Sequence, residues 1–164
     1  MFARISKDCI LESWLALIGS ANGRSEEFYR RIVEDLASFK VPHIVIEQKD
    51  VATSFEKLLF GKKRPAILVT NRVMTDYKMF IVSRDYGNQL TISWYLVSGN
   101  PIWRAVTAAI EMKKPLDLFQ LEELSCWITT VHHSVVDVTK EVAESVNFDF
   151  AKVDTKSKGF LNVT

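Results

Sequence analysis

The segment from Tyr77 to Val97 constrains the fold most strongly, because its pattern predicts a β-hairpin with a tight turn. Gly87 takes a positive φ at no steric cost and Asn88 tolerates one, so the chain can reverse within two residues. A two-residue turn sets the register, whereas a three-residue loop would exchange the partners. The predicted pairs are Tyr86 with Gln89, Arg84 with Thr91, Val82 with Ser93, Ile81 with Trp94, Phe80 with Tyr95 and Met79 with Leu96.

This register gives the hairpin two different faces, because side chains alternate along a strand. One face is wholly apolar and consists of Met79, Ile81, Leu90, Ile92, Trp94 and Leu96. The other, which we name the mixed face, consists of Lys78, Phe80, Val82, Arg84, Thr91, Ser93, Tyr95 and Val97. The apolar face therefore predicts a buried core, and the mixed face is a candidate binding surface.

Length and composition predict one globular domain over residues 1–164, since 48% of the 164 residues are hydrophobic. Cys9 and Cys126 lie in helical patterns far apart in the sequence. We interpret them as buried, reduced thiols of a cytoplasmic protein, with a disulfide between them as the alternative.

The net charge of +1 provides no overall attraction to nucleic acid or to anionic membranes. No stretch approaches the roughly 20 apolar residues of a membrane-spanning helix. We therefore expect a soluble protein without membrane association.

The first half of the chain alternates between helical and strand patterns. The predicted elements are helices over 10–18, 25–39 and 50–60 and strands over 43–47 and 66–70. Ser25 and Asp50 are the predicted N-caps, and Gly61 ends the third helix. The strand, helix and strand between 43 and 70 are spaced to permit a right-handed parallel crossover.

The second half contains the clearest helix signal. Asp117 and Gln120 have the spacing of a capping box, and apolar residues recur at steps of three and four to Val146. Before it, Pro101 suggests a helix over 101–110, although Trp103 to Thr107 also fits a strand.

These elements predict the α+β class: a small mixed or mainly antiparallel sheet of about four strands, packed against several helices, with a long C-terminal amphipathic helix. Residues 147–164 are too apolar for an ordinary disordered end, so we expect a docked C-terminal strap. Alternatively, Lys156, Lys158 and Phe160 anchor a partner.

The polar residues do not form a recognisable catalytic set. His132 and His133 are adjacent on a helix and point about 100° apart, so they do not suit one metal ion. His133 and Asp137 are spaced for a surface ion pair or, alternatively, for general-base catalysis. Glycine-rich phosphate loops are absent, and we expect neither a metal nor a cofactor.

The mixed face has two interpretations. Aromatic groups flanked by cations on a sheet can bind an anionic ligand or stack on bases, but a helix could cover the same face. The candidate ligand- or partner-binding residues there are Lys78, Phe80, Arg84, Thr91, Ser93 and Tyr95.

Three functions follow from these patterns. The leading hypothesis is a non-enzymatic protein-interaction or regulatory module with a protein partner or a second copy, since aromatic residues abound and no catalytic set is evident. The alternatives are a small-molecule-binding protein or enzyme that uses Arg84 and Tyr95, and a weak nucleic-acid binder.

Overall fold

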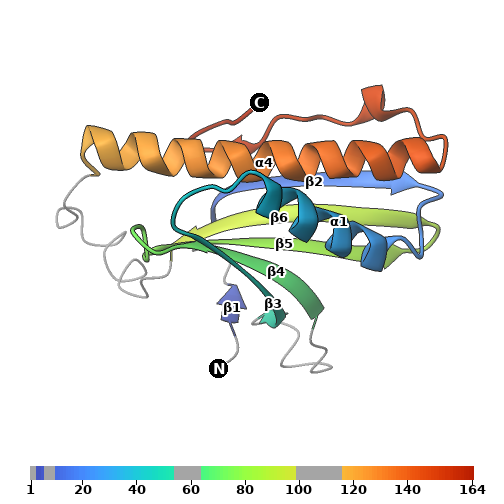
Figure 1. Ribbon diagram of the computed structural model, residues 1–164. Helices are drawn as coiled ribbons and strands as arrows, with labels where there is room; N and C mark the ends of the chain where they lie inside the picture. Colours follow the sequence, from blue (N-terminus) through green and yellow to red (C-terminus); the bar gives the residue numbers. More distant parts are fainter. Residues whose placement is uncertain (1–2, 6–9, 54–63, 99–115) are drawn as a thin grey trace.

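The computed structural model describes residues 3–5, 10–53, 64–98 and 116–164, which form an α+β fold (Figure 1). The strands are β1 (Ala3–Ile5), β2 (Ile10–Gly19), β3 (Ile44–Thr53), β4 (Arg64–Asn71), β5 (Tyr77–Tyr86), β6 (Gln89–Ser98) and β7 (Lys158–Gly159). The helices are α1 (Ser25–Ser38) and the long α4 (Leu118–Ser145), followed by a single 3₁₀ turn, η2 (Phe150–Lys152).

The described strands form one sheet in the order β1-β3-β4-β5-β6-β2-β7. Every neighbouring pair is antiparallel except β1 and β3, which are parallel. The prediction of a mainly antiparallel sheet is confirmed, but about four strands is too few. In the part of the chain that is described, the two α-helices are fewer than the several expected.

The hairpin of β5 and β6 has the predicted register throughout, from Tyr86 opposite Gln89 to Met79 opposite Leu96. Gly87 has a φ of 63°, as the tight turn requires. All six residues of the predicted apolar face are fully buried.

Both helices pack against this apolar face of the sheet. The helices also contact each other, since Arg31 Nη1 donates to Glu141 Oε2 at 2.6 Å and Ser134 Oγ donates to Asp35 Oδ2. One continuous apolar core therefore lies between the sheet and the two helices.

The helix predicted over 10–18 is wrong, because this segment is β2, paired along its length with β6. Trp14, Ala16 and Ile18 point into the core, while Leu15 and Leu17 lie on the opposite face. Because the intervening positions are also apolar, the segment fits both periodicities, and pairing with a distant strand decides between them.

The start of the helix predicted at Asp50 is also wrong, because β3 continues through Asp50 to Thr53. The parallel crossover is excluded by the antiparallel pairing of β3 with β4. Continuous backbone pairing along β4 keeps Asp50 extended opposite Pro65, and this outweighs its preference for helix caps.

The helix predicted from Ser25 is confirmed as α1, but Arg24 occupies the N-cap position and the Ser25 hydroxyl donates to Ser83 O at 3.1 Å. The expectation of a buried Cys126 is wrong, because this free thiol is exposed on α4. Cys9, the remainder of the 50–60 helix and the 101–110 element lie outside the described residues.

Helix α4 begins with the predicted capping box. Asp117 accepts from the Gln120 amide at 2.8 Å, and Gln120 Oε1 accepts from the Asp117 amide at 3.1 Å. Its apolar stripe is buried from Leu124 to Val142, as the periodicity predicts. Neither described helix is sufficiently long and apolar to cross a membrane.

Candidate functional site

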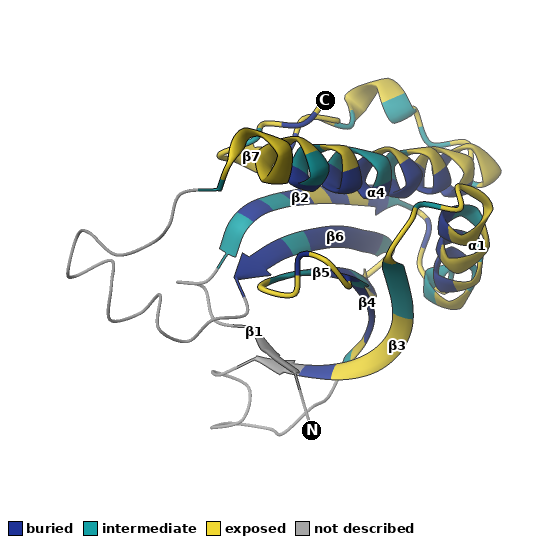
Figure 2. Cartoon of the chain, turned by 60° about the vertical axis from the view of Figure 1, so that its left-hand side comes forward, coloured by how far each residue is buried: buried dark blue, intermediate teal, exposed yellow. Residues whose placement is uncertain are grey.

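The mixed face lies on the side of the sheet opposite α1 and α4. The sheet bends strongly, and the two helices lie on the outer side of the bend (Figure 2). Side chains of the mixed face therefore converge inside the bend. In the part of the chain that the structure describes, no helix covers this face.

One end of the mixed face is a second apolar cluster. Phe80 is only 1% exposed and packs with Leu68 and Val97, together with Val51 and Ala66. Tyr95 and Val82 are half-buried against the cluster. Phe80 is therefore a packing residue in this conformation, and it is not available to stack on a base.

The other predicted residues of the mixed face differ in their exposure. Thr91 and Ser93 are buried, Lys78 is half-buried and Arg84 is exposed. Arg84 lies above the ring of Tyr86, with its Cζ 5.8 Å from the ring centroid, and Tyr86 is exposed as well. The exposed side chains of this face, which could contact a ligand or a partner, therefore lie at the end that carries Arg84 and Tyr86.

Two leucines that the sequence patterns did not select complete this end of the face. Leu15 and Leu17 are 56% and 48% exposed, and in the register of β2 they lie beside Ser93 and Thr91 of β6. We call the exposed set of Leu15, Leu17, Arg84 and Tyr86 the leucine–arginine patch. The alternation of Trp14, Ala16 and Ile18 could have revealed the leucines, had the segment been recognised as a strand.

The predicted tail residues lie elsewhere. Lys158 is in β7, beside Ser13 of β2, so β2 separates it from the hairpin. Lys156, Lys158 and Phe160 are exposed. The sheet therefore does not bring them together with Arg84.

The tail itself is held by the buried carboxylate of Glu12. This carboxylate accepts hydrogen bonds from Ser157 Oγ and from the amides of Leu161 and Asn162, at 2.8 and 2.9 Å for the two amides. Trp14 Nε1 adds a bond of 2.7 Å to Asp154 O. Glu12 is thus a structural anchor that sequence patterns did not distinguish.

Three consecutive polar residues of α4, His132 to Ser134, contact other elements of the fold. His133 Nε2 lies 2.8 Å from Thr164 O, and the described side chains show no hydrogen bond or ion pair between His133 and Asp137. His132 is fully buried and Ser134 is bonded to Asp35. Within the described ranges, His, Cys, Asp and Glu side chains form no group of three or more that could hold a metal ion.

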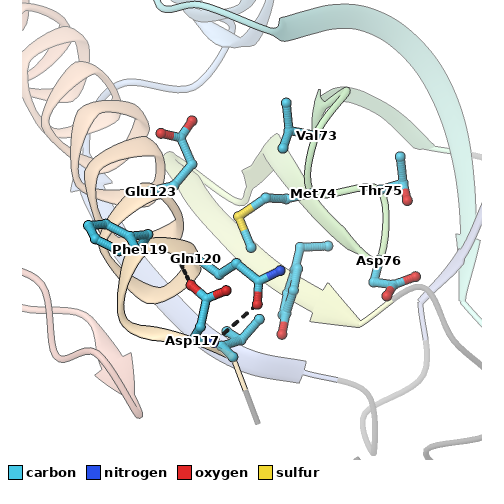
Figure 3. A pocket seen from close by; sticks show the side chains of 10 residues that line it. Val73, Met74, Thr75, Asp76, Asp117, Phe119, Gln120 and Glu123 are labelled. Carbon is cyan, nitrogen blue, oxygen red and sulfur yellow. Dashed lines mark hydrogen bonds between the residues drawn. The ribbon is translucent and has the colours of Figure 1, made fainter. Parts of the chain in front are cut away.

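A pocket of about 330 Å³ lies on the helix side of the sheet, between the β4–β5 connection and the first turns of α4 (Figure 3). Its apolar lining includes Val73, Met74 and Phe119. Its polar lining includes the carboxylates of Asp76 and Glu123. The pocket lies on the other side of the sheet from the leucine–arginine patch and at the opposite end of β5, since Tyr77 begins this strand and Tyr86 ends it.

The comparisons with known proteins give no family. The chain matches no protein-family model, and no curated protein or solved structure is significantly similar to it. The functional argument therefore rests on the residues and their geometry.

Proposed function

We propose that this protein is a non-enzymatic interaction module that binds a protein partner through the leucine–arginine patch. The observation that supports the proposal is the exposure of two neighbouring leucines on β2 and of Arg84 on β5, on the same face of the sheet with only β6 between them. Exposed apolar side chains that adjoin each other are typical of partner-binding surfaces.

The composition of the patch favours a protein partner. Leucine side chains offer apolar area, Tyr86 offers an aromatic ring, and Arg84 offers a delocalised cation held over that ring. Tyrosine and arginine are common among the residues that dominate interface energies. A partner segment with apolar residues and a carboxylate is the complement of this surface.

The rigid framework also favours recognition over catalysis. Leu15, Leu17 and Arg84 lie on paired strands, which hold their spacing before a partner arrives. No base or nucleophile among the described residues adjoins Arg84 in a hydrogen-bonded arrangement typical of catalysis.

The test is capture of partners from the native lysate with the tagged protein, in nuclease-treated and untreated halves. We expect a specific protein to be retained in both halves by the wild type and lost with Leu15→Ser/Leu17→Ser or with Arg84→Ala. The matched control is Val33→Ser, which removes an exposed valine from α1. Retention of the same protein partner by all of these variants would contradict the proposal.

The alternatives predict different outcomes. A weak nucleic-acid binder would lose its partners in the nuclease-treated half. If the protein instead binds a small molecule, or is an enzyme, through Arg84 and Tyr95, the capture should yield no protein partner. A metabolite should then stabilise the protein against heat. Either result would replace the proposed function.

A further inference from the structure

The pocket at the start of α4 is a second concave feature, independent of the leucine–arginine patch and of the proposed function. Met74 is buried, and its side chain lies between the β4–β5 connection and α4 (Figure 3). Val73 and Phe119, also in the lining, are exposed by 65% and 78%. The pocket thus combines a sheltered apolar interior with apolar side chains at the surface.

The charged residues of the lining that the structure describes are all acidic. Asp76, Asp117 and Glu123 line the pocket, and none of the described residues that line it is a lysine, arginine or histidine. Among the described residues, Glu123 accepts one hydrogen bond, of 3.4 Å, from the side-chain amide of Asn71, and Asp117 accepts from the backbone amide of Gln120. These donors are neutral, so the negative charges of both carboxylates remain uncompensated by them.

The neighbouring phenol does not change this charge balance. Burial and the charge of Asp76 raise the pKa of Tyr77, so its hydroxyl stays protonated and neutral at physiological pH. An anion attracted to the positive end of α4 would meet the capping carboxylate of Asp117 first. The described lining of the pocket therefore disfavours anions and favours a cation.

We propose that this pocket binds a lysine or arginine side chain presented by a partner peptide with apolar neighbours. The long methylene stem of such a side chain packs along Met74, and the carboxylates of Glu123 and Asp76, which lie on opposite sides of Met74, attract its charged head (Figure 3). The neighbouring apolar residues of the peptide would cover Val73 and Phe119. Charge complementarity and the apolar lining together select this occupant.

The experiment uses three acetylated and amidated pentapeptides, alanine–leucine–X–leucine–alanine, in which X is lysine, norleucine or glutamate. Binding is followed by NMR of the full-length protein labelled at its methionine methyl groups. Met74 reports on the pocket, and the fully buried Met79 of β5 is an internal reference. Titrations to millimolar peptide at near-physiological salt limit nonspecific charge attraction.

We expect the lysine peptide to shift the Met74 signal saturably without moving Met79, and the norleucine peptide to bind at least tenfold more weakly. The isosteric variant Asp76→Asn/Glu123→Gln should weaken the lysine peptide at least tenfold, whereas Asp137→Asn, elsewhere on α4, should not. Equal binding of the norleucine or glutamate peptide, unchanged binding by the double variant, or an unmoved Met74 signal would each overturn the proposal.

Discussion

Trp94 of β6 donates a hydrogen bond from Nε1 to Nδ1 of His132 on α4, at 3.1 Å. Both side chains are fully buried, and their ring centroids lie 5.6 Å apart in an edge-on arrangement. Acceptance at Nδ1 places the proton of the neutral imidazole on Nε2. This nitrogen is buried and has no hydrogen-bond partner among the described residues. The pair therefore joins β6 of the sheet to the long helix α4.

The free energy of unfolding should fall as the pH drops below about 6.5. Burial lowers the pKa of His132 from its ordinary value of 6.5, with a smaller effect of His133 in the same direction and opposing effects of Thr155 and Glu12. The unfolded chain therefore binds the proton first, and the difference grows until the pH reaches the lowered pKa of the folded state.

Urea unfolding at about pH 7 and about pH 5 measures this effect. The matched variant is His132→Asn, because its side-chain oxygen can still accept from Trp94 but does not titrate. We expect the variant to lose less unfolding free energy than the wild type over this interval. Equal losses would show that His132 does not contribute to the acid sensitivity.

Replacing Trp94 should be severely destabilising. Trp94→Ala removes a fully buried side chain from the centre of the apolar face and leaves Nδ1 of His132 without its donor, so we expect a loss of about 3–5 kcal/mol. The control Arg84→Ala removes an exposed side chain and should change the unfolding free energy by less than about 0.5 kcal/mol. A neutral Trp94→Ala in urea denaturation would contradict the assigned faces.

The substitution Gly159→Ala, which adds a single methyl group, should release the tail from the Glu12 carboxylate. This glycine has a φ of 156°, and a Cβ there would overlap Leu11 O and the Glu12 carboxylate. Gly159→Ala should therefore expose the amides of Leu161 and Asn162 to hydrogen exchange while leaving those of β5 and β6 protected. The control is Gly23→Ala, where no atom lies within 4 Å of the added Cβ, although its φ of 81° remains strained. Unchanged protection of Leu161 and Asn162 in Gly159→Ala would exclude this anchoring.

Tyr29→Phe should cost about 1–3 kcal/mol of unfolding free energy. The Tyr29 hydroxyl accepts from the Ser83 amide at 2.8 Å and donates to Pro65 O at 2.7 Å, and burial raises its pKa to about 12. The variant leaves a buried amide of β5 without its partner. Tyr86→Phe, at an exposed tyrosine, should be neutral by the same urea measurement. A loss equal in both variants would show that the Tyr29 bonds contribute no net stability.

The hairpin and α4 could be predicted from sequence because their signals are local. Gly87 and Asn88 determine a turn, the turn determines the register, and the register assigns every side chain of β5 and β6 to a face. Asp117 and Gln120 likewise form their capping box within four residues. Neither element requires knowledge of a distant part of the chain to be predicted.

The strand character of β2 and of β3 around Asp50 depended on the tertiary structure. Residues 10–18 are apolar on both faces, so only pairing with β6, more than 70 residues away, makes them extended. The same pairing exposes Leu15 and Leu17 beside the Arg84 end of the mixed face. Only part of the leucine–arginine patch could therefore be predicted from sequence. The positions of Arg84 and Tyr86 follow from the hairpin turn, whereas those of Leu15 and Leu17 depend on the long-range pairing of β2 with β6.

The sequence by itself determined a hairpin with one apolar face and a capped amphipathic helix to cover it. Only the tertiary structure decided that the sheet bends, which buries Phe80 within a second cluster and leaves Arg84 exposed. It also decided that Glu12 is the buried anchor of the tail. The physical reason is that turns and caps are satisfied by neighbours in the chain, whereas burial depends on which distant elements pack together.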